Sequence, residues 1–271
     1  MLNPGVKPRQ TIFPCRPQML MHTPPLTIRK RAKATLRQLR FHPVTDAGPV
    51  FLSPRFSRAQ RRELMFWISR LPSAFLRRLP PLKLASADQL TVVRSSVFIN
   101  ENPLPQNRSP VEPTHAVSFI PERYIVLDVE LFRRRVEAGR ILYHELCHFI
   151  WPRLGNPRRL IFETLNLHEF RRGVRGELGY SSEWRKLDLL AKSRTPARAH
   201  RNAKFFPGIS ASMRRRWLEY VCESFCDTGA FVLLGSERRR IHSEYTLSLM
   251  ARKRRTRQWS EIVLGCEAER L

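Results

Sequence analysis

Two long apolar stretches without proline stand out in the second half of the chain, and each predicts a helix. The first covers residues 136–151 and ends at Pro152, which cannot continue a helix. The second covers residues 217–234. The few polar side chains within them are mostly imidazoles, carboxylates and thiols. Such groups are costly to bury without partners, so both helices are expected to carry a site.

Ahead of the first helix the pattern changes to alternation. In residues 124–132 every second side chain from Ile125 to Leu131 is aliphatic, which predicts a strand. Apolar runs at 90–99 and 116–120 predict further strands, and residues 158–191 predict one or two amphipathic helices. Short strands followed by helices indicate an α+β fold.

The first predicted helix contains His144-Glu-Leu-Cys-His148. Residues four apart lie on the same face of a helix, so the two imidazoles can bind one Zn²⁺. Glu145 in this spacing usually does not bind the metal and acts as general base on the activated water. A chain of this composition should contain the spacing by chance about 0.015 times. The alternative is a pair of hydrogen-bonded histidines in the core.

The second predicted helix carries Glu219, Glu223 and Asp227 at intervals of four, which places them in one acidic stripe. Like charges at this spacing repel, so a cation is expected to face them. A catalytic zinc takes three protein ligands and keeps one open position. We expect Glu223 to be the third ligand, with Glu219 as the fallback. The alternative is that the stripe is the solvated face of a surface helix.

The His144–His148 segment and the Glu223–Asp227 segment together resemble the gluzincins, the thermolysin-like zinc metallopeptidases. They are also similar to the small bacterial zinc-peptidase domains of the ImmA/IrrE type. The resemblance covers only these two helices. It implies a zincin-like fold, in which a small antiparallel or mixed sheet packs on the helix with the two histidines and further helices follow. An extended substrate would then lie beside an edge strand, held by backbone hydrogen bonds.

The same resemblance assigns roles to individual residues. It implies that Glu223 is the third ligand and that Asp227 hydrogen-bonds a ligating histidine and fixes its tautomer. In the gluzincins a histidine well downstream of the third ligand stabilises the transition state. Here the only later histidine is His242, whose role stays open. His168 is an outside candidate for third ligand.

The five cysteines are odd in number and have no zinc-knuckle spacing. Cys222 and Cys226 lie four apart in the second helix, where they fit either small buried side chains or extra metal ligands. A reducing cytoplasm is the simplest setting for such cysteines. The sequence shows neither the apolar core of a signal peptide nor an apolar run long enough to span a membrane.

The net charge of +26 is supplied mostly by arginine and suggests contact with nucleic acid or another anionic surface. The basic runs are scattered and are not interleaved with aromatic residues, so incidental surface charge is the alternative. Composition divides the chain into three parts. These are a basic, proline-rich and disordered extension (1–50), a zincin-like metallopeptidase domain (51–235) and a basic helical tail (236–271).

The sequence therefore predicts a zinc peptidase acting on peptides or proteins. His144, His148 and Glu223 bind Zn²⁺, Glu145 is the general base and Asp227 orients a ligand. Two other functions stay open: a nucleic-acid-associated metalloprotease or regulator, and a non-catalytic basic binding protein with a structural zinc.

Overall fold

A computed structural model of the protein describes residues 27–28, 36, 39–44, 48–93, 96–99, 111–192 and 210–265. The larger of its two sheets has five strands. In spatial order they are β2 (His42–Pro43), β3 (Val50–Leu52), β4 (Leu82–Ala87), β9 (Tyr124–Asp128) and β8 (Ala116–Phe119). The three central strands are parallel, and both outer strands are antiparallel to their neighbours. The predicted α+β fold with a mixed sheet is confirmed.

The second sheet has four strands, ordered β1 (Thr27–Ile28), β6 (Ser96–Ile99), β5 (Leu90–Val93) and β7 (Val111–Pro113). Its β5 and β6 are an antiparallel pair, so the single strand predicted over 90–99 is two strands. Residues 94–95 between them lie outside the described residues.

The strand predicted over 124–132 is also shorter than expected, because β9 ends at Asp128. The Asp128 carboxylate accepts hydrogen bonds from the backbone N–H of Glu130 at 2.8 Å and of Leu90 at 3.2 Å. The first of these bonds caps the 3-10 helix η1 (Val129–Arg133), which buries Leu131. The apolar alternation thus continues past the point where the capping bond ends the strand.

The helices provide the rest of the described fold: α2 (Arg58–Ile68), α3 (Ser73–Leu76), α4 (Arg135–Ile150), η2 (Trp151–Arg153), α5 (Gly155–Arg171), α6 (Tyr180–Lys192), α7 (Ala211–Leu233), η4 (Gly235–Glu244) and α8 (Leu249–Val263). The helices predicted over 136–151 and 217–234 are α4 and α7. Helix α7 begins six residues earlier than predicted, because the Ser210 side chain accepts a hydrogen bond from the Met213 N–H and caps it.

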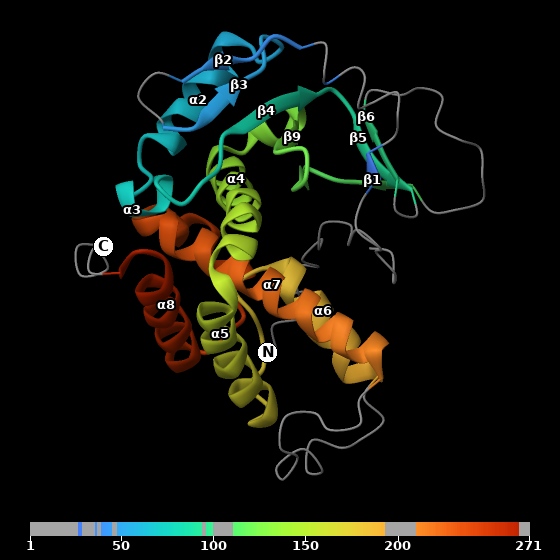
Figure 1. Ribbon diagram of the computed structural model, residues 1–271, viewed down its shortest axis with the longest axis vertical. Coiled ribbons are helices and arrows are strands. Elements are labelled where there is room, and N and C mark those ends of the chain that lie inside the picture. Colours follow the sequence, from blue (N-terminus) through green and yellow to red (C-terminus); the bar gives the residue numbers. More distant parts are fainter. Residues whose placement is uncertain are drawn as a thin grey trace, which may run out of the picture.

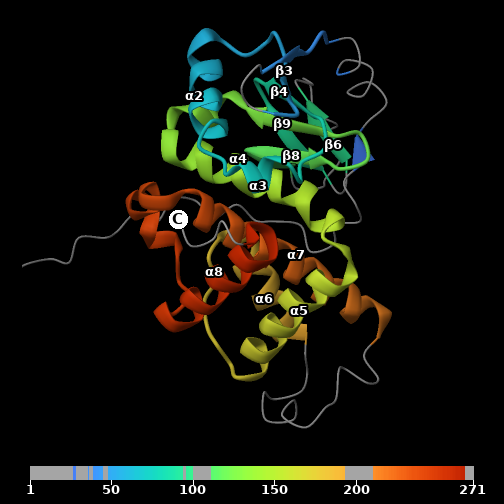
Figure 2. The ribbon, with the colours of Figure 1, turned by 60° about the vertical axis from the view of Figure 1, so that its left-hand side comes forward.

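Helix α4 lies between the large sheet and α7, so that the three form successive layers (Figures 1 and 2). A Cβ added at Gly229 of α7 would lie 2.4 Å from the Cys147 sulfur of α4. The bare backbone at Gly229 is therefore what lets the two helices approach so closely. Fully buried residues of both, including Leu146 and Phe225, share one hydrophobic core with the sheet.

Helix α8 lies within the predicted basic tail and packs into that core through Trp259. Its Arg255 is fully buried and bonds to residues of α5, of α7 and of the segment between α5 and α6. The guanidinium donates to Glu169 of α5 at 2.6 Å, to Glu177 ahead of α6 at 3.1 Å and to the Tyr220 hydroxyl of α7 at 3.2 Å. This buried network fixes α7 against the helices around it.

Parts of the predicted 1–50 extension are described, and several of them are paired in strands or buried. Strand β1 pairs with β6, β2 pairs with β3, and Leu36 is buried. The other described residues of this range belong to short loops and to the start of β3, and the remainder lies outside the described residues. Within the part of the chain that the structure describes, no helix is long and apolar enough to cross a membrane.

Candidate metal centre

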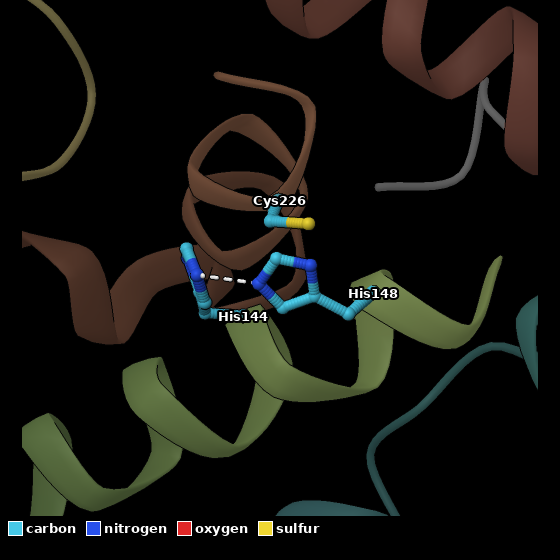
Figure 3. Close-up of side chains that lie close together, drawn as sticks. All are labelled: His144, His148 and Cys226. Carbon is cyan, nitrogen blue, oxygen red and sulfur yellow. Dashed lines mark hydrogen bonds between the residues drawn. The ribbon is translucent and has the colours of Figure 1, made fainter. Parts of the chain in front are cut away.

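The imidazoles of His144 and His148 project from α4 toward α7 and converge (Figure 3). Their Nε2 atoms are 3.2 Å apart. His144 is almost completely buried, whereas the His148 side chain keeps 19% of its surface exposed. The pair therefore lies at the border between the core and the solvent, where water or a substrate could reach a bound metal.

Glu223 of α7 brings its carboxylate to the same point. Its Oε2 lies 3.2 Å from His144 Nε2 and 3.9 Å from His148 Nε2. A tetrahedral zinc bound to nitrogen or oxygen at about 2.0–2.1 Å places its ligand atoms about 3.3–3.4 Å apart. The three separations between these atoms, 3.2, 3.2 and 3.9 Å, fit that geometry with little side-chain movement. The donor set present here therefore fits one zinc ion.

Asp227, one turn further along α7, holds His144 in place. Its Oδ1 accepts a hydrogen bond from His144 Nδ1 at 2.8 Å. Its Oδ2 accepts two bonds from Ser182 of α6, at 3.0 Å from the N–H and 2.6 Å from the hydroxyl. With its proton on Nδ1, His144 presents Nε2 toward His148 and Glu223, as a metal ligand must.

Gly179 allows α6 to start directly against Asp227. A Cβ at this position would lie 2.3 Å from the Asp227 Cγ. The sequence pattern placed residues 179–182 within the predicted helical region 158–191 and gave them no role in the site. Ser182 makes the second contact of the carboxylate, and no spacing rule connects it to Asp227 in advance.

The charges of the centre are balanced by protons when no metal is bound. Burial alone would lower the pKa of His148, but the Glu223 carboxylate and the Cys222 thiol raise it to about 9. Burial alone would lower the pKa of His144. The neighbouring carboxylates of Asp227 and Glu223 outweigh it and raise the pKa well above its usual value. Burial would raise the pKa of Glu223, yet Arg185 and both imidazoles lower it strongly. Metal binding must therefore displace protons from both histidines.

Arg185 of α6 is a member of the centre that no sequence pattern indicated. Its Nη2 lies 3.2 Å from Glu223 Oε1, whereas Oε2 faces the histidines. The guanidinium thus engages one carboxylate oxygen and leaves the other for a metal. The Arg185 and Glu223 side chains are 19% and 13% exposed, so solvent reaches this side of the centre.

Glu145 forms its hydrogen bonds with the sheet. The Ser118 hydroxyl of β8 donates a hydrogen bond to Glu145 Oε2 at 2.5 Å and also lies 3.3 Å from the Glu145 backbone oxygen. Glu145 as a whole is half-buried. A side-chain hydrogen bond therefore links Ser118 of the edge strand β8 to Glu145 of α4.

The other candidates from the sequence are placed differently. Glu219 forms an exposed ion pair with Arg215 at 2.9 Å. His168 is exposed in the last turn of α5. The side chain of His242 lies outside what the structure describes. Of the three acids in the stripe, Glu223 and Asp227 contact the histidines and Glu219 faces solvent.

Two cysteines of α7 approach the histidines as well. The buried Cys226 sulfur and one ring nitrogen from each of His144 and His148 all lie within 4.8 Å of one another (Figure 3). The Cys222 sulfur lies 3.7 Å from His148 Nδ1. Both Glu223 and Cys226 can therefore complete a metal site. We favour Glu223 as the third ligand because its distances fit a zinc ion with little side-chain movement.

Comparison with known proteins adds no relative to this picture. No family model matches the chain, and no match was found among curated proteins or solved structures. The resemblance to the gluzincins stays a prediction, and the function has to be argued from the geometry of the centre itself.

Proposed function

We propose that the protein is a zinc-dependent peptidase with a zincin-like fold. The observation that carries this proposal is the triangle formed by His144 Nε2, His148 Nε2 and Glu223 Oε2. Three ligands of these kinds are the set that a hydrolytic zinc uses, since they leave a fourth position for substrate or water.

Each side chain of the centre has a distinct task in this proposal. His144, His148 and Glu223 hold the zinc, which when bound supplies a Lewis acid that brings the pKa of a coordinated water to about 7. Glu145 accepts a proton from the attacking water and delivers it to the leaving amine as the peptide C–N bond breaks. The Ser118 hydroxyl keeps the Glu145 carboxylate beside the edge strand.

The position of β8 supports the zincin-like part of the proposal. Among the described strands β8 has a neighbour on one side only, and it runs antiparallel to that neighbour, β9. It packs on α4 and carries Ser118, which bonds to Glu145. A peptide pairing with the free edge of β8 would lie next to the general base, held by backbone hydrogen bonds that depend little on its sequence.

Replacing Glu145 tests the mechanism. The zinc-loaded Glu145→Gln variant should hydrolyse a peptide library about 10²–10⁴-fold more slowly than the wild type, because it lacks the general base. It should still bind one zinc per chain, since Glu145 is not a ligand. Glu130→Gln is the matched control, because Glu130 forms an exposed ion pair with Arg133 and should retain full activity. Wild-type hydrolysis by zinc-loaded Glu145→Gln would show that the mechanism is wrong.

A further inference from the structure

Cys226 is a third metal-binding side chain at the two histidines, and the peptidase mechanism gives it no task. It belongs to α7, one residue before Asp227 and three after Glu223, so the helix turns all three toward α4. Its side chain is fully buried, and its sulfur lies near the His148 ring (Figure 3). A buried thiol within 4.8 Å of two imidazole nitrogens is a ligand in position.

We propose that Cys226 would release its thiol proton to solvent, bind the same metal ion as a thiolate and so occupy its fourth position in the resting protein. The inference rests on the proposed function, because it needs the metal held by His144, His148 and Glu223. Cys226 thereby closes the site, and hydrolysis requires its sulfur to move away so that water can take its place.

The distances allow this fourth bond. Zinc binds sulfur at about 2.3 Å and nitrogen at about 2.0–2.1 Å, which puts these ligand atoms about 3.5 Å apart in a tetrahedral site. The Cys226 sulfur lies within 4.8 Å of one ring nitrogen of each histidine, so forming the fourth bond calls for a movement on the order of 1 Å. A rotation of the side chains can supply a movement of that size.

The balance of charge favours the same arrangement. Among the groups in direct contact with the ligands, a zinc ion, the carboxylates of Glu223 and Asp227 and the guanidinium of Arg185 leave one net positive charge in a largely buried place, and the Glu145 carboxylate is bonded to Ser118 of the sheet instead. A thiolate from Cys226 cancels that charge. Buried charges are tolerated when they are paired or coordinate a metal, so the neutral set of groups is the more stable one.

The neighbouring Cys222 is not placed for this role. Its sulfur lies 3.7 Å from Nδ1 of His148. The metal has to bind the other nitrogen of that ring, because Nε2 is the atom that faces His144 at 3.2 Å. Cys222 is therefore the matched control. It is a thiol on the same helix, one turn away, and it contacts His148 at Nδ1, the nitrogen that does not bind the metal.

Cobalt substitution of the full-length protein tests the inference without relying on activity. Tetrahedral Co²⁺ shows visible d–d bands whatever its ligands, whereas a thiolate ligand adds a charge-transfer band in the near ultraviolet. The wild type and Cys222→Ser should show both features. Cys226→Ser should keep the d–d bands and lose the charge-transfer band, and its zinc-loaded form should hydrolyse peptides faster than the wild type because the fourth position is open.

Two results would overturn the inference while leaving the peptidase proposal intact. One is a cobalt-loaded wild type with d–d bands and no charge-transfer band, and the other is a Cys226→Ser protein that keeps that band. If Co²⁺ and Zn²⁺ fail to bind the wild type at all, both proposals are wrong. If Cys226→Ser does not fold, zinc X-ray absorption of the wild type and of Cys222→Ser gives the answer, since a sulfur neighbour at about 2.3 Å should be present in both. Its absence from the wild type rejects the thiolate ligand.

Discussion

Asp227 has two roles: it orients the ligand His144, and it joins α7 to α6 through Ser182. The substitution Asp227→Asn tests both roles. The native carboxylate accepts three hydrogen bonds, from His144 Nδ1 at 2.8 Å and from the N–H and hydroxyl of Ser182 at 3.0 and 2.6 Å. Asparagine has the same size but offers one acceptor oxygen and one amide donor. Either His144 or Ser182, both of which donate to the native carboxylate, must therefore face the amide N–H of the asparagine.

Either orientation of the new amide has a cost that can be measured. If the amide N–H faces His144, the ring must accept at Nδ1 and carry its proton on Nε2, the atom that binds the metal. Loss of such a partner weakens metal binding about 10–100-fold. If the amide N–H faces Ser182 instead, a buried N–H is left without an acceptor, which costs about 1–3 kcal/mol of stability.

We expect Asp227→Asn to show weaker zinc binding, measured by competition with a chromogenic chelator, and a lower free energy of unfolding in urea for the metal-free protein. Glu219→Gln is the control on the same helix, because that side chain only forms an exposed ion pair. Ser182→Ala removes one hydroxyl bond and should cost about 1 kcal/mol with a smaller effect on zinc. A folded Asp227→Asn protein that binds zinc as tightly as the wild type would refute the role of Asp227.

Two further predictions concern the buried network and the protons of the centre. Arg255→Met should lower the free energy of unfolding in urea by about 3 kcal/mol, because the buried carboxylates of Glu169 and Glu177 lose the cation they share and keep only Arg254 and Lys186, respectively; the exposed Arg257→Met is the control, and equal stabilities would contradict the prediction. The metal-free protein should lose about 3 kcal/mol of stability as the pH rises from about 6.5 to about 10, because the pKa of His148 is raised from 6.5 to about 9 on folding and the proton is lost as the pH passes through that value. Zinc affinity should rise over the same interval, since the metal then displaces fewer protons, and a pH-independent affinity would show that the histidines are not its ligands.

The elements nearest the centre were the ones that the sequence could predict. Helices α4 and α7 have long apolar runs with a clear stop or cap, and the spacing of His144 and His148 has meaning only on a helix. Strands β8 and β9 were also predicted, although Asp128 ends β9 earlier than the apolar pattern does. Helix α2 and strand β4 were not predicted. Strand β4 is the central strand of the sheet, buried on both faces, so it has little alternation to read.

The contacts that complete the centre depend on the tertiary fold and were not predictable. Arg185, Ser182 and Gly179 belong to α6 or its start, and no fixed spacing links them to Glu223 or Asp227. The acidic stripe on α7 was a partial guide, since it did not show that Glu219 faces solvent. Contact of the +26 charge with nucleic acid stays a prediction, and a salt-dependent gel shift would test it.

A crystal structure of the zinc-loaded protein tests the central claim most directly. It should show one zinc ion at about 2.0–2.2 Å from His144 Nε2, His148 Nε2 and Glu223 Oε2, with Glu145 outside the ligand set. A zinc ion bound elsewhere, or a Glu223 carboxylate that stays with Arg185 and takes no part in binding, would contradict the account.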